Sequence, residues 1–260
     1  MIFSRQENGK LFRPIATLVK LERILQNQGF GSRRQCRQWV ELGEVRINGE
    51  VVDDPGAEID TAGLVFEVEG HSWTFREKTY VALYKPAGYE CSHEPKHHRS
   101  VYSLLPQKLV ARNVQSVGRL DQDTTGLLLF SDDGAFIHNL SSPKKHVPKV
   151  YRAELAEAGT DALVQRLLDG VDLIDEPQPV PALHARLLAE RTLEMSIDLG
   201  KYHVVKRMIA AAGNHVEQLH RSGFGGLHLG EELLADLTEG QWVYLEEADL
   251  QQLHSAARKA

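Results

Sequence analysis

The sequence predicts an α+β protein of two domains, a small helix-helix-hairpin unit followed by a larger unit with a mixed or antiparallel sheet. Its 260 residues exceed the roughly 100–200 residues of a usual single core. In the larger part, helical and strand patterns interleave without the repeating unit of roughly thirty residues that a doubly wound sheet requires. Together these observations favour two separate cores of the α+β class.

Three local signals predict the first domain over residues 18–64. Apolar residues recur at helical spacing at its start, which indicates a short first helix. Ser32, with Gln35 three residues later, predicts a capping box and hence the beginning of a second helix. The pair Asn48-Gly49 between two short apolar segments is typical of a tight hairpin. Two helices therefore lead into a small hairpin.

The second domain is predicted over residues 79–260, after a linker at 65–78. Its first strand is the apolar run that begins at Thr79. Alternating or helical patterns then predict helices near 135–140, 160–168 and 203–212, strands near 150–155 and 191–199, and extended segments within 216–229. Thr160 is the expected cap of the second of these helices.

Charge is separated along the chain, although the net charge is only −6. Residues 1–46 contain nine Lys or Arg against four Asp or Glu and so carry +5, which leaves −11 for the remainder. A basic amino-terminal part can bind a phosphate backbone while the acidic remainder favours solubility. Residues 1–17 are expected to form a basic, flexible extension, because Pro14 discourages a continuous helix.

The sequence also indicates where the protein works. No run approaches the roughly 18 apolar residues of a membrane span, and the first ten residues are too polar for a secretory signal. Cys36 and Cys91 lie far apart, which favours two free thiols over a disulfide. We therefore expect a cytoplasmic protein with no membrane partner.

Arginines gather at the start of the second predicted helix. Arg33 and Arg37 share a face of that helix, near an N-terminus that favours anions, so they can bind phosphates. An ordinary solvated face is the alternative. The helices, the Ser-Arg-Arg cap and the Val-Arg-Ile-Asn-Gly-Glu-Val-Val hairpin resemble the small RNA-binding domain first recognised in ribosomal protein S4. This resemblance implies RNA binding, but no reaction, by Arg33, Arg34, Arg37 and Arg46.

The most informative stretch is the loop Gly118–Gly126, which places Asp121 and Asp123 between two glycines and just before an apolar strand. Glycines permit a tight loop that can aim a short acidic side chain inward. Arg119 can keep such an acid ionised. Two alternatives are a strand-entry turn whose aspartates bind nearby amides, and the Asp-x-Asp-x-Thr nucleophile of a magnesium-dependent phosphatase. The phosphatase pattern, however, places its apolar strand before the first aspartate.

Four motifs in sequence order closely resemble the pseudouridine synthases that act on ribosomal RNA, over about residues 18–250. They are the Gly-Arg-Leu-Asp-x-Asp-Thr-x-Gly loop, Lys149-Val150-Tyr151, the basic run 200–208, and the segment 213–221. Four further patterns are similar to the branch that modifies 16S RNA of the small subunit. They are Lys85-Pro86, Asp121-x-Asp123-Thr124-Thr125, Ser142-Pro143 and Gly200-x-Tyr202-His203. Val204 departs from the pattern, since glutamine is common there.

The resemblance implies a role for each matching residue. Asp121 is the catalytic aspartate, Tyr151 stacks on the flipped-out base, Lys206 is the basic partner of the aspartate with help from Arg119, and Leu219 is an apolar pocket wall. The remaining predicted pocket residues are Gly118, Leu120, Asp123 and Thr124, and the cations predicted to guide RNA in this domain are Lys144, Lys145 and Lys149.

The implied reaction is the isomerisation of one uridine to pseudouridine in 16S RNA, with uridine 516 as the family's expected target. It needs no cofactor or metal, because a carboxylate suffices either to attack the nucleotide or to remove a sugar proton, and both routes stay open. We expect a monomer that acts on 16S RNA or on a partly assembled small subunit. A non-catalytic RNA-binding assembly factor is the remaining alternative.

Overall fold

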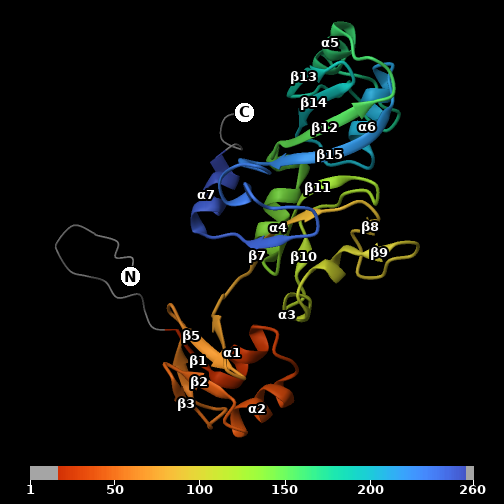
Figure 1. The fold of residues 1–260 in the computed structure, drawn as a ribbon. Coiled ribbons are helices and arrows are strands. Elements are labelled where there is room, and N and C mark those ends of the chain that lie inside the picture. The colour runs from red at the N-terminus through yellow and green to blue at the C-terminus, as the bar shows by residue number, and fades with distance from the viewer. Residues whose placement is uncertain (1–16, 256–260) are drawn as a thin grey trace, which may run out of the picture. The chain divides into compact units, whose positions relative to one another are not determined.

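The computed structural model describes residues 17–255 and divides into two compact units (Figure 1). The first unit comprises the described residues up to Glu77 together with Gln107–Asn113, and the second comprises Lys78–Pro106 and the described residues from Val114 onward. The predicted flexible extension falls almost entirely outside the described residues. No helix within 17–255 is long and apolar enough to cross a membrane.

The first unit packs two helices against short strands. Antiparallel pairs join β1 to β4, and a four-stranded sheet has the order β3-β2-β5-β6. The capping box predicted at Ser32 and Gln35 is confirmed at the start of α2. The elements are β1 (Leu18–Lys20), α1 (Leu21–Asn27), α2 (Arg33–Glu41), β2 (Val45–Ile47), β3 (Glu50–Val51), β4 (Glu58–Asp60), β5 (Val65–Val68) and β6 (His71–Thr74).

Two local predictions for this unit differ from the structure. The first helix begins at Leu21, because residues 18–20 pair with β4 as a strand. Residues 65–78 do not form a simple linker, since β5 and β6 form a hairpin there and β5 also pairs with β2. The side chains of Phe66 and Val68 on β5 are buried in the core of the unit, and this alternation of two residues is a strand signal that the sequence analysis missed.

Helix α3 (Gln107–Ala111) belongs to the first unit although the sequence places it within the second predicted domain. The Lys108 ammonium lies 3.9 Å from the ring centre of Phe30 and 3.2 Å from that of Trp73. Gly29 has a φ of +81°, and a Cβ there would overlap the Lys108 carbonyl oxygen. Cation–π contacts and this close backbone approach therefore hold the helix against residues far away in sequence.

The second unit is built on a mixed sheet, which confirms the predicted fold class, and its strands follow the order β13-β14-β12-β15-β11-β7-β17. Most pairs are antiparallel, and β11 pairs with β15 in parallel. Two further strands lie off this path, β10 beside β11 and β16 beside β15. The strands are β7 (Tyr80–Lys85), β10 (Gln115–Ser116), β11 (Thr125–Ser131), β12 (Lys149–Leu155), β13 (His184–Ala189), β14 (Thr192–Ile197), β15 (Val216–Phe224), β16 (Leu227–His228) and β17 (Trp242–Tyr244).

Short helices and one small strand pair complete this unit. Thr160 caps α5 as expected from the sequence, since its hydroxyl accepts the Leu163 N–H. The remaining elements are β8 (Tyr89–Glu90), β9 (Arg99–Ser100), the 3₁₀ turns Val101–Leu104, Pro143–Lys145 and Glu232–Leu234, and the helices α4 (Gly134–Ser141), α5 (Asp161–Asp169), α6 (Val204–Ala211) and α7 (Glu247–Ser255).

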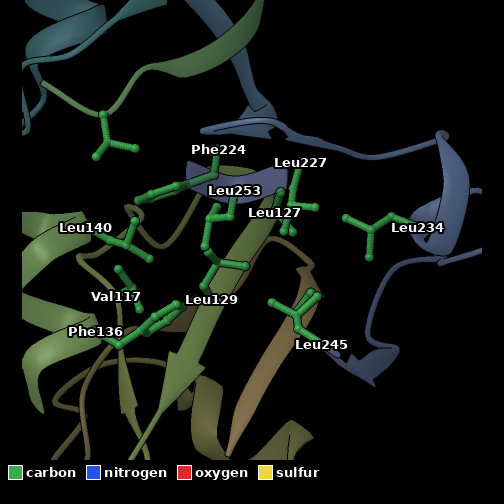
Figure 2. Close-up of a cluster of buried hydrophobic side chains, with 12 residues drawn as sticks. Val117, Leu127, Leu129, Phe136, Leu140, Phe224, Leu227, Leu234, Leu245 and Leu253 are labelled. Atoms are coloured by element: carbon green, nitrogen blue, oxygen red, sulfur yellow. The ribbon is translucent and has the colours of Figure 1, made fainter. Parts of the chain in front are cut away.

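A buried apolar cluster fixes β11 directly behind the Gly118–Gly126 loop. Figure 2 shows Leu127 and Leu129 of β11 among Phe136 and Leu140 of α4 and Leu253 of α7. Leu128 and Phe130, which alternate with them, are also fully buried, so β11 is covered on both faces. A strand this firmly packed gives the preceding loop a rigid support.

Candidate active site

The Gly118–Gly126 loop is tied down by a buried lysine at the end of β7. The ammonium group of Lys85 is fully buried and donates to the carbonyl oxygens of Pro86, Gln122 and Thr124 at 3.0, 3.3 and 2.8 Å. Burial lowers the pKa of Lys85, while the nearby aspartates oppose that shift. Lys85 therefore fixes the backbone on both sides of Asp123.

Gly126 shows why the loop needs a glycine at its end. Its φ is +111°, and a Cβ there would overlap the carbonyl oxygen of Arg221 on the parallel strand β15. Gly118 also has a positive φ, +70°, but faces open space. The second glycine thus permits β11 and β15 to approach closely, which brings the loop beside β15.

The two loop aspartates have different partners. The Nε2 atom of His203 lies 3.2 Å from Oδ1 of Asp121, and Nζ of Lys206 lies 4.0 Å from Oδ2. Lys206 donates more closely to both oxygens of Asp123, at 2.8 and 2.7 Å. Burial alone would raise the pKa of Asp123, but the hydrogen bond and charge of Lys206 outweigh it and lower the pKa. Lys206 thus reaches both acids and binds Asp123 the more tightly.

Sequence analysis missed His203 as a site residue. It occupies the left-handed region with a φ of +49° at the start of α6, and its ring stacks on Tyr202 with centres 3.7 Å apart. A histidine held in a strained backbone conformation next to an acid is a recognisable functional feature. Its sequence signals are the basic run that starts at Gly200 and the Gly200-x-Tyr202-His203 pattern within that run.

A cavity of about 420 Å³ opens between the loop, β12, β15 and the start of α6. Most residues predicted for the site line it, namely Gly118, Arg119, Leu120, Asp121, Thr124, Lys149, Tyr151 and Leu219. Two residues predicted for the site, Asp123 and Lys206, are not among the lining residues, and they bind each other. Val204, which departs from the family pattern, is buried in the cavity wall.

The residues in the cavity wall differ in exposure. Arg119 is exposed there, whereas Leu120 and Thr124 are buried. Tyr151 is also buried and pairs with Arg221 in the register of β12 and β15. Leu219 lies two residues before Arg221 on β15 and is likewise buried. The cavity therefore presents an acid, an aromatic ring and an apolar side chain together.

The three lysines predicted to guide RNA lie in two environments. Lys144 and Lys145 are exposed on a 3₁₀ turn, as a role in guiding RNA requires. Lys149 is only 6 % exposed and lies in the cavity wall, so it does not belong to the outer surface. The difference arises because Lys149 begins β12 and shares the face of Tyr151, two residues along the strand.

The arginines of the first unit surround one buried acid. Glu22 of α1 accepts from Nε of Arg33 at 2.9 Å and from Nη1 of Arg37 at 3.3 Å, and the Arg33 hydrogen bond lowers the pKa of Glu22. Both arginine side chains remain at least half exposed. Arg34 is exposed, and Arg46 donates to the Gly49 carbonyl oxygen across the hairpin.

Comparison with known proteins identifies the family. A family model described as RNA pseudouridylate synthase matches residues 79–211. The chain belongs to this family. An S4 domain model matches residues 19–65, so the synthase carries an RNA-binding domain ahead of its catalytic part. This confirms the resemblance seen in the sequence, and it makes the protein an isomerase.

Relatives match the synthase over almost their whole length. The ribosomal small subunit pseudouridine synthase A of Vibrio parahaemolyticus is 35% identical over 89% of this chain and 98% of its own. The protein of the same name from Escherichia coli is 37% identical over 89% and 98%. A crystal structure of a pseudouridylate synthase is 32% identical, covers 90% of this chain and 99% of its own, and superposes with a TM-score of 0.62.

Proposed function

We propose that this synthase converts one uridine of 16S ribosomal RNA to pseudouridine, with uridine 516 as the expected target and Asp121 as the catalytic residue. The observation that carries the proposal is the cavity that joins Asp121 to Tyr151, with His203 and Lys206 beside the acid. The names of the relatives, which refer to the small ribosomal subunit, support the choice of RNA.

The cavity suits a single nucleotide that has left its stack. Its volume of about 420 Å³ lies within the roughly 300–1,000 Å³ typical of small-molecule sites. Tyr151 offers the base an aromatic face in place of its lost neighbours, which is worth about 1–3 kcal/mol. Leu219 supplies an apolar wall next to it. A flipped-out uridine would thereby place its sugar near Asp121.

The reaction moves one glycosidic bond from N1 to C5 of the uracil. The C1′–N1 bond breaks and its electron pair stays with the uracil, while Asp121 either bonds to C1′ or takes the proton from C2′. The detached uracil then turns and C5 bonds to C1′. On the covalent route the Asp121–C1′ bond breaks as C5 bonds, and on the other route Asp121 returns the proton to C2′. Finally C5 loses its proton and N1 gains one. Atoms and charge balance on either route without oxidation or net hydrolysis.

The groups around Asp121 have separate tasks. His203 Nε2 and Lys206 Nζ lie 3.2 and 4.0 Å from the carboxylate oxygens of Asp121, so an imidazole and an ammonium group can orient this side chain toward the nucleotide. Asp123 holds the Lys206 ammonium with two hydrogen bonds and so sets its position. Arg119 lies in the same wall and can contact a phosphate of the bound nucleotide.

Exposed cations outside the cavity would bind the rest of the RNA. Arg33, Arg34, Arg37 and Arg46 lie on the S4 domain, and Lys144 and Lys145 lie on the catalytic unit. Contacts of this kind act on the phosphate backbone and weaken with salt. We propose a cytoplasmic monomer without a cofactor, acting on 16S RNA or a partly assembled small subunit.

Substitution of the two loop acids tests the assignment. We expect Asp121→Asn to lower turnover by at least about 10²–10⁴-fold, because an amide can neither bond to C1′ nor accept a proton, while RNA binding persists. Asp123→Asn keeps the shape of the loop and is expected to lose much less. Turnover is measured as pseudouridine formed in 16S RNA, by mass shift after chemical derivatisation.

Two outcomes would contradict the proposal. Retained turnover in the Asp121→Asn variant would remove Asp121 from the chemistry. Pseudouridine mapping of small-subunit RNA from cells with and without this gene tests the target, and an unchanged map would refute the choice of 16S RNA.

A further inference from the structure

Two buried cations in the cavity wall have no task in the mechanism above. Lys149 is 6 % exposed and Arg221 is 2 % exposed. Lys149 donates to the backbone carbonyl of Asp198 at 3.3 Å, and Nε of Arg221 donates to that of Leu127 at 2.7 Å. Within the described part of the chain, the buried Nη2 of Arg221 has no hydrogen-bond partner.

The strand register explains why both cations face the cavity. Lys149 and Tyr151 are two residues apart on β12, and Leu219 and Arg221 are two residues apart on β15, so each pair shares a face. A β-bulge between Val150 and Tyr151 shifts the register of β15 by one residue. An extra residue of this kind re-aims the side chains beyond it.

The ring of Phe224 lies near both cations. Its ring centre is 5.4 Å from Nζ of Lys149 and 5.1 Å from Cζ of Arg221, and it lines the same cavity. The two positive groups therefore flank one aromatic ring at the wall on which Tyr151 also lies.

The charge of this pair is poorly balanced by the protein. The other charged or titratable groups that line the cavity include Arg119, Asp121, Lys201 and His203. The Asp121 carboxylate already contacts His203. The Asp198 carboxylate attracts Lys149 through space, but its hydrogen bond is to His146 at 2.7 Å. Burial, with repulsion from Arg221, lowers the pKa of Lys149 to about 8. Buried cations of this kind gain most from an anionic ligand.

We propose that Lys149 and Arg221 donate hydrogen bonds to the uracil of the bound nucleotide and stabilise the negative charge that this ring carries while it is detached from the sugar. The inference rests on the proposed function, since it assigns two further catalytic residues to that reaction. The detached uracil is an N1 anion, and it spreads its charge over N1, C5 and both carbonyl oxygens. Lys149 Nζ and Arg221 Nη2 are donors fixed in advance, which is how a site lowers the energy of a developing anion.

The position of Tyr151 favours uracil over a phosphate as the ligand. Tyr151 and Arg221 are directly paired across β12 and β15, so a base stacked on the tyrosine lies next to the guanidinium. A phosphate that bound these donors would carry the same charge in the ground state and in the transition state, so its contacts would affect KM and not kcat. The two ligands therefore predict different kinetics.

The test compares the steady-state kinetics of Arg221→Met and Lys149→Met on a 16S RNA fragment. We expect kcat to fall by about 10²–10³-fold for each variant, with KM changed by less than about threefold, because the lost contacts act on charge that develops during the reaction. Arg191→Met is the matched control. Arg191 makes the same Nε-to-carbonyl bond, to Leu155 at 2.8 Å, but does not line the cavity, so kcat should be unchanged.

The pH profile separates a catalytic role from a structural one. Lys149 must be protonated to act, so we expect kcat of the wild-type enzyme to fall as pH rises through about 8. Lys149→Arg stays charged at higher pH, and its kcat should hold past that point. Loss of the uridine proton in alkali is common to both enzymes and cancels in the comparison. This profile stays informative even if Arg221→Met folds poorly.

Three outcomes would overturn the inference. A rise in KM with kcat unchanged would make the pair a binding site for a phosphate. An equal pH profile for the wild type and an active Lys149→Arg variant would remove Lys149 from the chemistry. If the wild-type enzyme forms no pseudouridine in 16S RNA, the proposed function is refuted and the inference fails with it. This outcome appears without any variant, so it is distinct from the two outcomes that refute the inference alone.

Discussion

Two pairs of cations in this molecule differ in the groups that they bind. In the S4 unit, Arg33 and Arg37 share the buried carboxylate of Glu22. In the catalytic unit, Lys149 and Arg221 donate to backbone carbonyls instead. A buried carboxylate offsets the charge of the cations that it binds. A cation that binds only neutral carbonyl oxygens keeps its positive charge available to an anionic ligand. The comparison thus separates a framework pair, whose charge Glu22 partly offsets while its exposed sides stay open to RNA, from a buried pair that has no carboxylate partner.

The exposure of the two pairs supports this distinction. Arg33 and Arg37 are 57% and 50% exposed, so water solvates the part of each guanidinium that Glu22 does not bind. Lys149 and Arg221 are almost fully buried and lose that solvation. A folded protein that keeps this loss of solvation free energy uncompensated typically does so at a functional site, where the ligand supplies the missing interaction.

The largest effect is expected when a carboxylate is introduced beside Lys149 and Arg221, because the two pairs of cations then have similar partners. Leu219→Glu would place an acid on the same strand face as Arg221, two residues away. We expect kcat to fall on the order of 10²-fold below that of Leu219→Gln, because the new charge neutralises the cations that the uracil needs. The glutamine variant matches the shape and polarity of glutamate without its charge. Pseudouridine formation measures kcat, and circular dichroism checks folding. Equal rates in the two variants would contradict a role for positive charge at this wall.

Lys85 is a third buried cation, and it sharpens the contrast because three carbonyl oxygens occupy its ammonium group. Lys85→Met removes all three bonds, each worth about 1.5–3 kcal/mol for a charged donor. We expect kcat to fall by about 10- to 100-fold, since the loop no longer holds Asp121 in place, while RNA affinity is unchanged. Lys78→Met, an exposed lysine just before β7, is the control. A kcat equal to that of the control would show that the loop holds its shape without Lys85.

Local signals predicted much of the fold. The capping box at Ser32 and the cap at Thr160 act within one turn of chain, and both are confirmed. Residues 65–78 failed as a linker because β5 and β6 are short, and their strand character depends on pairing with β2 and with each other. Helix α3 joins the first unit through contacts with Phe30 and Trp73, which no local pattern encodes.

The candidate site divides in the same way. The order of the family motifs along the chain assigned Asp121 and Tyr151 to the site, and both residues line the cavity. His203 and Arg221 were missed, since their place depends on the turn before α6 and on a bulge between β12 and β15. Lys149 was predicted to guide RNA together with Lys144 and Lys145, but it is buried, which is unusual for lysine. Only the strand register reveals that it faces the cavity.

Glu22→Gln tests the S4 pair, because it removes the carboxylate that Arg33 and Arg37 share. We expect the S4 unit to become less stable, because two guanidinium groups then meet a neutral amide. RNA binding should tighten at low salt, since Arg33 and Arg37 are no longer neutralised. Their release would steepen the salt dependence of log K by about 0.7–0.9 for each added phosphate contact. Glu41→Gln, which removes only the exposed Arg37 pair at 3.6 Å, is the control.

The pH dependence of stability isolates Glu22 from the other acids. The Arg33 hydrogen bond lowers the pKa of Glu22 in the folded state, so its stabilisation is present above the unfolded pKa of about 4.3 and is lost as pH falls through the lower folded value. Acid should therefore destabilise the S4 unit of the wild type more steeply than that of Glu22→Gln, in urea titrations followed by a probe in that unit. Parallel slopes for the two proteins, together with equal salt dependence of RNA binding, would show that Glu22 does not hold the charge of these arginines. The S4 pair would then be as available to a ligand as the cavity pair, and the distinction between them would fail.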